Sequence, residues 1–306
     1  MLGVVQGFAL ILSIIGIGYL IGLFGVVKGE QRRVLNVVAF YVASPALLFD
    51  VLQSSDPSVL ISPVVLVTSV SAVAAAALFV LASRIWFRRD LATTALGATT
   101  AGYINANNLG LPVAIYILGD AAYVAPILIM QLLVFAPTLL TVLESTRGNR
   151  RGALAAVGRA VTNPIILASA AGLVFSLAGW QLPQIALDPI QMLGAAAIPM
   201  VLLSFGISLH GQRALQPGSG RSAVLTASII KLIAMPLIAW LMCLALGVSA
   251  HETFVAVTVA ALPTAQNVYN YAATYRRGEI IVRDTIMVTT FASLVVIAFI
   301  AWIAAA

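Results

Sequence analysis

Apolar runs longer than twenty residues are the feature that most constrains this chain. Residues 4–27 read VVQGFALILSIIGIGYLIGLFGVV. A helix crosses a hydrocarbon core with about 20 apolar residues, whereas a spanning β-strand alternates apolar and polar residues over about ten positions. The runs lack that alternation, and charged residues make up only 8% of the 306-residue chain. We therefore expect an all-α integral membrane protein, because so few charges cannot cover the surface of a soluble fold of this length.

Charges, Gly/Pro clusters and run length divide the chain into ten expected transmembrane helices. The first run has no basic segment before it and is too long for a signal peptide, so it is expected to be a permanent span. Gly18 and Gly22 within it form a small-xxx-small pair that is expected to pack helices. The expected spans are 4–26, 34–53, 61–83, 92–118, 122–143, 162–179, 189–209, 222–246, 253–274 and 284–304.

The basic residues predict the orientation of these spans. Fifteen of the sixteen Lys and Arg residues fall in the five alternate connections between spans, and both termini carry none. By the positive-inside rule these connections are cytoplasmic. We expect a multi-pass protein of the cell (inner or plasma) membrane with both termini outside and with the lipid bilayer as a partner. No nucleic-acid binding is expected, because the charges are spread over five short loops.

Two similar stretches suggest an internal duplication. YVASPALLFDVL in span two and GAAAIPMVLLSFGI in span seven share A-x-P before a Leu-rich run, and Pro45 and Pro199 lie 154 residues apart. Pro112 and Pro263 lie 151 residues apart. Five spans per copy would place the second copy upside down, an architecture that recurs in secondary transporters; the alternative is a chance match of prolines. The expected organisation is a first repeat at 1–145, a cytoplasmic linker at 146–160 and a second repeat at 161–306.

Asparagines gather at two places in this apolar chain. Five of its eight asparagines lie there: Asn105, Asn107 and Asn108 in INANNLGLP, and Asn267 and Asn270 around LPTAQN. Proline removes a backbone donor, and broken backbone within a membrane is tolerated only against protein or a cavity. We therefore predict that spans four and nine unwind near their middles, at 104–112 and 262–267, and meet around a substrate site. The alternative is that the prolines only kink the two helices and that the neighbouring Asn and Gln side chains hold helices together by hydrogen bonds.

Several motifs together resemble the auxin efflux carrier family, within the broader group that includes the bile-acid sodium symporters. They include LN-x4-Y-x3-PALLF in span two, N-x4-G-L-P in span four, NPII in span six, KLIAMPLI in span eight and ALPTAQN in span nine. The resemblance runs nearly end to end. It implies ten helices in a five-plus-five inverted repeat with crossed broken helices four and nine. It also implies a dimerising scaffold of spans 1, 2, 6 and 7, and a transport domain of spans 3–5 and 8–10 that moves like an elevator.

The resemblance also implies site residues. Asn105 and Ser44 match substrate-contacting positions of the plant carriers, and Pro112 and Pro263 match the prolines of the crossing. Gln266 and Asn267 stand where the plant proteins are less polar, so a smaller or more hydrophilic ligand than auxin is expected. Span three, TSVSAVAAAALFV, lacks the acidic and basic support pair of the plant carriers, so the auxin-specific mechanism is not expected to carry over.

Lys231 is the one basic residue inside an expected span. A buried ammonium usually marks function, here either as an anion partner or as a charge in place of a coupling cation; the alternative is a side chain that extends back to the interface. None of the ten acidic residues lies at mid-span, which favours an anionic or neutral substrate. A sodium ion could still bind near Gln266, Asn267 or Gln131, although an interhelical hydrogen bond explains Gln131 equally well.

We therefore expect a secondary carrier, not an enzyme, that moves a small organic anion such as a carboxylate by elevator-type alternating access as a homodimer. No cofactor is expected, and the coupling ion could be H⁺ or Na⁺. The alternatives are a sodium-coupled importer similar to the bile-acid symporters, or a channel. The predicted substrate-binding residues are Ser44, Asn105, Asn107, Asn108, Pro112, Lys231, Pro263, Thr264, Gln266, Asn267 and Asn270.

Overall fold

The computed structural model describes residues 2–55, 62–146, 158, 162–210, 215 and 220–304. Within these ranges the regular structure is helical, apart from one isolated β-bridge. Helical segments lie within each of the ten expected spans, but the count of ten crossings stays a prediction. Among the described residues, six helices are long and apolar enough to cross a membrane, namely Glu30–Ser54, Pro63–Phe87, Ala121–Ser145, Gln184–Leu209, Arg221–Leu246 and Glu279–Ala304.

The chain folds as two compact units. Unit 1 comprises Met1–Ile61, Asn107–Ile129 and Val161–Gln212, and unit 2 comprises Ser62–Ala106, Met130–Ala160 and Arg213–Ala306. Unit 1 thus contains the spans expected for a scaffold, together with residues 107–129, and unit 2 contains the rest of the spans expected to move. The predicted inverted repeat and its boundaries at 1–145, 146–160 and 161–306 are a different division of the chain and stay predictions.

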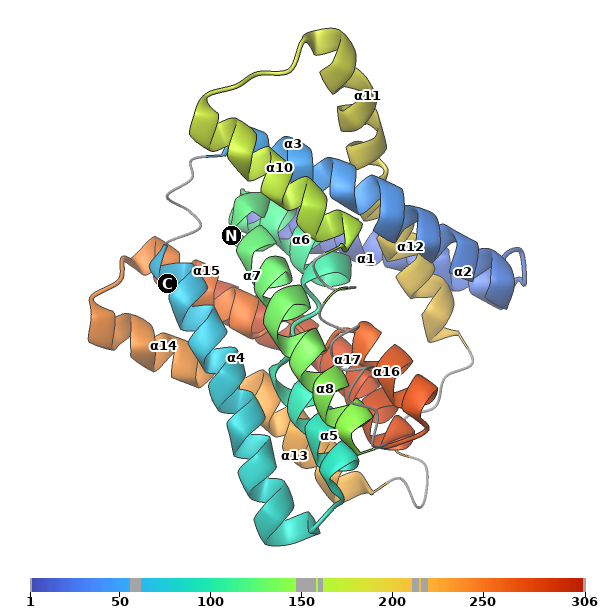
Figure 1. The fold of residues 1–306 in the computed structure, drawn as a ribbon, viewed down its shortest axis with the longest axis vertical. Helices are drawn as coiled ribbons and strands as arrows, with labels where there is room; N and C mark the ends of the chain where they lie inside the picture. Colours follow the sequence, from blue (N-terminus) through green and yellow to red (C-terminus); the bar gives the residue numbers. More distant parts are fainter. Residues whose placement is uncertain are drawn as a thin grey trace. The chain divides into compact units, whose positions relative to one another are not determined.

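Unit 1 is built on two helix pairings. Helix α1 (Leu2–Leu23) packs against α12 (Ala197–Leu209), and α3 (Ser44–Ser54) packs against α10 (Pro164–Ala178), which lies beside it in Figure 1. Helix α11 (Gln184–Ala195) also contacts α3. The shorter elements that unit 1 contains in whole or in large part are α2 (Gly29–Val38), η1 (Ala39–Ala43), η4 (Ala106–Gly110), α6 (Leu111–Val113), η5 (Ala114–Leu118), η6 (Ala121–Tyr123) and α7 (Ala125–Met130).

Glycines bring α1 and α12 together at backbone distance. A Cβ added to Gly18 would overlap the Leu203 carbonyl oxygen, and one added to Gly206 would overlap that of Ile15. Small residues allow such close approach in membranes, where packing rather than water drives helix association. The expectation that Gly18 packs helices is confirmed.

Gly206→Ala should separate these two helices and destabilise unit 1 by about 1–3 kcal/mol, the usual cost of overpacking. We expect a lower apparent thermal unfolding midpoint for the purified protein in detergent. Gly16→Ala is the matched control, since nothing lies within 4 Å of its added Cβ. Equal midpoints for Gly206→Ala and the wild type would contradict the close crossing.

Helix α4 (Pro63–Ala82) packs against three other helices of unit 2. Helices α5 (Leu91–Gly102), α14 (Met235–Leu246) and α15 (Ala250–Ala260) pack against α4, while α17 (Glu279–Ala304) packs against α13 (Arg221–Ile229) and α16 (Asn267–Tyr275). The remaining described elements of the unit are η3 (Ser83–Phe87), η7 (Gln131–Phe135), α8 (Ala136–Ser145) and η8 (Ile230–Ala234).

Asp90 fixes the start of α5. Its carboxylate accepts hydrogen bonds from the Thr93 backbone N–H at 3.1 Å and from the Thr93 hydroxyl at 2.7 Å. Partial burial by itself raises the pKa of Asp90, but these hydrogen bonds and the charge of Arg277 outweigh it and hold the pKa below its usual value. The ionised carboxylate is therefore the form that caps this helix.

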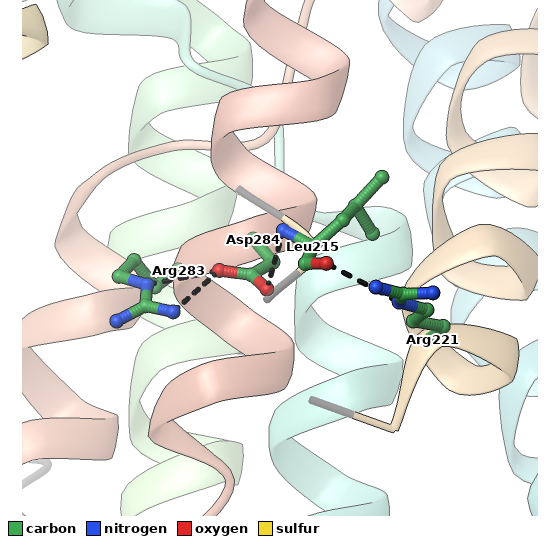
Figure 2. Close-up of polar contacts among 4 residues, drawn as sticks. All are labelled: Leu215, Arg221, Arg283 and Asp284. Atoms are coloured by element: carbon green, nitrogen blue, oxygen red, sulfur yellow. Dashed lines mark hydrogen bonds and ion pairs between the residues drawn. The ribbon is translucent and has the colours of Figure 1, made fainter. Parts of the chain in front are cut away.

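A buried carboxylate ties the chain before α13 to α17 (Figure 2). Asp284 is fully buried, and its Oδ2 accepts the Leu215 backbone N–H at 2.9 Å. Its Oδ1 accepts a hydrogen bond from Nε of Arg283 at 2.9 Å. The same oxygen forms an ion pair with Nη2 of that guanidinium at 2.8 Å. Arg221 Nε donates to the Leu215 carbonyl at 3.2 Å. Both backbone polar groups of Leu215 are therefore hydrogen-bonded.

Four prolines each follow a π-helical turn. The turns η1, η4, η7 and η8 end two residues before Pro45, Pro112, Pro137 and Pro236 respectively. A proline has no N–H, and its ring crowds the preceding turn of an α-helix. A π-helical turn is wider and uses i→i+5 hydrogen bonds, so it accommodates the ring without ending the helix. These prolines therefore bulge their helices instead of breaking them.

Candidate functional site

The first helix break lies at residues 103–105. Helix α5 ends at Gly102, and Tyr103 is extended, with φ −78° and ψ 123°. A Cβ on Gly102 would overlap the Ala72 carbonyl oxygen of α4, so glycine is needed where the helix ends against α4. The chain becomes helical again at Ala106, the first residue of η4.

The second break lies at residues 261–266, between α15 and α16, and it meets the first within unit 2. Ile104 and Thr264 form an antiparallel β-bridge. The Asn105 backbone N–H donates to the Pro263 carbonyl at 2.7 Å. Ile104 and Thr264 are fully buried, and Asn105 is 2% exposed. The interrupted helices thus satisfy part of each other's backbone.

Thr264 makes two further hydrogen bonds at the junction, which is the place where the two helix breaks meet. Its hydroxyl donates to the Thr100 carbonyl of α5 at 2.7 Å, and its backbone N–H donates to the Thr289 hydroxyl of α17 at 3.2 Å. All three threonines are fully buried. The Thr100 carbonyl belongs to the last turn of α5, where acceptors have no intrahelical partner, so Thr264 caps one broken helix from the other.

Thr264→Val keeps the side-chain shape but leaves the buried Thr100 carbonyl without this donor. We expect a loss of about 1–3 kcal/mol of stability, seen as a lower thermal unfolding midpoint in detergent. Thr264→Ser is the control, because it retains the hydroxyl and should stay close to the wild type. A Val variant as stable as the Ser variant would show that the hydrogen bond does not hold the junction.

Lys231 contacts the end of α15, next to the second break. Its side chain is fully buried, and its Nζ donates to the carbonyl of Ala260, the last residue of α15, at 3.0 Å. Nζ also lies 3.1 Å from Sδ of Met235. Within the described ranges no carboxylate lies within ion-pair distance of Lys231; the ion pairs there are Arg33–Glu30 and Arg283–Asp284. The side chain is thus directed into unit 2 and not toward the interface.

Gln131 is a second buried polar side chain of unit 2. It is 1% exposed, and neither amide atom has a hydrogen-bond partner among the described residues. Gln131 begins η7, and Phe135 at the end of that turn contacts Tyr103 at the first break, with ring centroids 6.0 Å apart. The interhelical hydrogen bond considered for Gln131 is therefore not seen among the described residues. The sodium ion considered there stays a prediction.

The other predicted amides of unit 2 lie at the start of α16. Gln266 and Asn267 are partly exposed, and Asn270, one turn further on, is exposed. The N-terminal end of a helix carries partial positive charge. Accessible amides therefore lie at the start of α16, next to the fully buried junction at Thr264.

The remaining predicted site residues belong to unit 1. Ser44 is fully buried. Asn107 is 8% exposed, and its Nδ2 donates to Oδ1 of Asn108 at 3.1 Å. Pro112 is buried in α6. The structure thus brings Asn105, Pro263 and Thr264 together. Lys231, in η8, is hydrogen-bonded to the last residue of α15, the helix that ends at the second break.

The predicted unwinding of the whole stretch 104–112 is wrong. Only residues 103–105 are non-helical, and the chain is helical through Asn107, Asn108 and Pro112. The physical reason is the π-helical turn η4, which precedes Pro112 and accommodates its ring. The prediction for the second break is correct in position, since Pro263 lies within the non-helical segment.

Sequence reasoning missed Thr100 and Thr289. Their signal was present as threonine pairs in apolar spans, GATTAG at 97–102 and MVTT at 287–290. No sequence pattern marks the Ala260 carbonyl as a functional group, because every residue has a backbone carbonyl. Among the described residues no group of three His, Cys, Asp or Glu side chains could hold a metal ion.

Comparison with known proteins adds independent evidence. The membrane transport protein family matches residues 4–301. An uncharacterized transporter of Methanocaldococcus jannaschii is 25% identical over 96% of this chain and 96% of its own. A Rhizobium meliloti protein named "Putative malonate transporter" is 28% identical over 92% of this chain and 89% of its own. An uncharacterized transporter of Methanothermobacter thermautotrophicus is 30% identical over 65% of this chain and 66% of its own.

Proposed function

The chain belongs to the membrane transport protein family of the auxin efflux carriers, and we propose that it is a secondary carrier for a small organic anion of the dicarboxylate class. The family and the relatives are transporters and not enzymes, and the chain is a multi-pass membrane protein. The name of the Rhizobium meliloti relative supports malonate as the first substrate to test.

The observation that carries the proposal is the unpaired charge of Lys231. The buried charged residues in the described part of the chain are Lys231 and Asp284, and Asp284 is paired with Arg283. With Lys231 protonated, the interior of unit 2 near the breaks carries a net positive charge. At an effective dielectric constant of about 20, a unit charge about 8 Å from an anion stabilises it by about 2 kcal/mol. This charge favours an anionic substrate over a neutral or cationic one.

The start of α16 is the proposed contact region for the substrate. Its partial positive charge and its accessible amides, Gln266, Asn267 and Asn270, suit a carboxylate. Lys231 donates to Ala260 and is fully buried, so it acts on the substrate through its electrostatic field. The proposed roles of Ser44 and Pro112 rest on the family resemblance, and those of Asn107 and Asn108 rest on their place in the asparagine cluster of span four.

Transport is proposed to proceed by alternating access, with unit 2 moving as an elevator and the protein forming a homodimer. The separate packing of two units supports a mechanism in which one moves against the other. The buried junction of Ile104 and Thr264 supports a unit 2 that keeps its shape during the movement.

Uptake of labelled malonate into proteoliposomes tests the proposal. A carrier should show saturable uptake and counterflow, in which internal unlabelled malonate accelerates the entry of labelled malonate. Single-channel current would instead support the channel alternative, and binding without flux would support a receptor. Absence of uptake for a panel of mono- and dicarboxylates would contradict the proposed substrate class.

Asn267→Ala and Asn105→Ala should each lower malonate uptake by about tenfold or more, because a hydrogen bond to a charged group contributes about 1.5–3 kcal/mol. Folding, checked by size-exclusion elution and thermal midpoint, should be retained. Asn36→Ala in α2 is the matched control, since it removes the same amide from unit 1. Unchanged uptake in both site variants would remove this site assignment.

A further inference from the structure

The contact between Lys231 and the end of α15 has a consequence for ion coupling. Helix α15 stops at Ala260, and the chain then turns through Pro263. Proline at position 263 has no N–H, and the Thr264 N–H, which an unbroken helix would direct to the Ala260 carbonyl, donates instead to Thr289. The Ala260 carbonyl accepts from Lys231 at 3.0 Å. An ammonium thus occupies the place of the missing backbone donor.

Such helix ends attract cations. The C-terminal end of a helix carries partial negative charge, and in carriers with interrupted helices the unwound carbonyls and C-terminal ends of half-helices coordinate the coupling cation. Helix α5 also ends at this junction, and its Thr100 carbonyl is bonded by the neutral Thr264 hydroxyl. Two helix C-terminal ends thus converge, and Lys231 is the cation bonded to one of them.

Resting on the proposed function as a carrier, we infer that Lys231 is a permanent replacement for a coupling metal cation at the end of α15. Both groups that its Nζ contacts, the Ala260 carbonyl and the Met235 sulfur, are acceptors, as a protonated amine requires. The side chain is tethered, so the positive charge stays in unit 2 during the whole transport cycle. Anion transport by this protein therefore needs no sodium.

Thermal unfolding in two salts tests this inference without any substrate. A ligand that binds only the folded state raises the unfolding midpoint. In detergent at constant ionic strength, the wild type should unfold at the same midpoint in sodium chloride as in choline chloride. Lys231→Ser removes the ammonium and leaves room and an oxygen ligand, so its midpoint should rise with sodium in a saturable manner and stay unchanged in choline.

Lys231→Met is the matched control, because its side chain fills the space without supplying an oxygen ligand or a charge. It should show no response to sodium. If Lys231→Ser does not fold, Lys231→Asn replaces it with the same expectation. A saturable sodium response of the wild type would overturn the inference, as would a folded Ser or Asn variant that does not respond to sodium.

Proteoliposomes provide the transport measurement. Malonate uptake by the wild type should have the same rate with sodium or choline outside. A loss of uptake on replacing sodium by choline would overturn the inference while leaving the carrier function intact. A protein that moves no anion at all would contradict the proposed function, and the unfolding measurements would still decide the role of Lys231.

Discussion

Every backbone polar group inside a membrane must find a partner within the protein, and the two helix breaks of unit 2 meet that requirement together. Residues 103–105 and 261–266 would each leave unpaired N–H and C=O groups in hydrocarbon, where each costs several kcal/mol. The Ile104–Thr264 bridge, the Asn105–Pro263 hydrogen bond and the Thr264 hydroxyl supply partners across the junction. Neither break has these partners without the other, so the pair forms a single structural element.

This constraint also explains why charge and amides gather here. Ending α15 at Ala260 creates an acceptor that Lys231 satisfies, and starting α16 at Asn267 creates a helix N-terminus next to accessible amides. The same junction thus offers partial negative charge to a lysine and partial positive charge to an anion. The proposed binding of an anion at this place rests on that arrangement of charge.

Much of the fold could be predicted from the sequence, because membrane spans depend on long apolar runs and loop charges. The meeting of two helix breaks was predicted from the asparagines and the prolines, while the role of these residues in substrate binding stays a prediction. The position of the first break could not be predicted, since Pro45, Pro112, Pro137 and Pro236 are accommodated by π-helical turns, whereas Pro263 lies at a break. Which proline breaks its helix depends on whether another segment accepts the freed backbone, and that partner is distant in sequence.

Disulfide trapping measures whether the two helix breaks meet at Ile104 and Thr264. In an antiparallel bridge of this kind, where the flanking residues exchange the hydrogen bond, the Cα atoms lie about 4.5 Å apart, within the range that a disulfide spans. In a Cys243→Ser background, which removes the single native cysteine, Ile104→Cys with Thr264→Cys should form a bond with a membrane-permeable oxidant, and Ile104→Cys with Asn270→Cys should not. Failure of the first pair to cross-link in folded protein, or equal cross-linking of both pairs, would contradict the meeting of the two breaks.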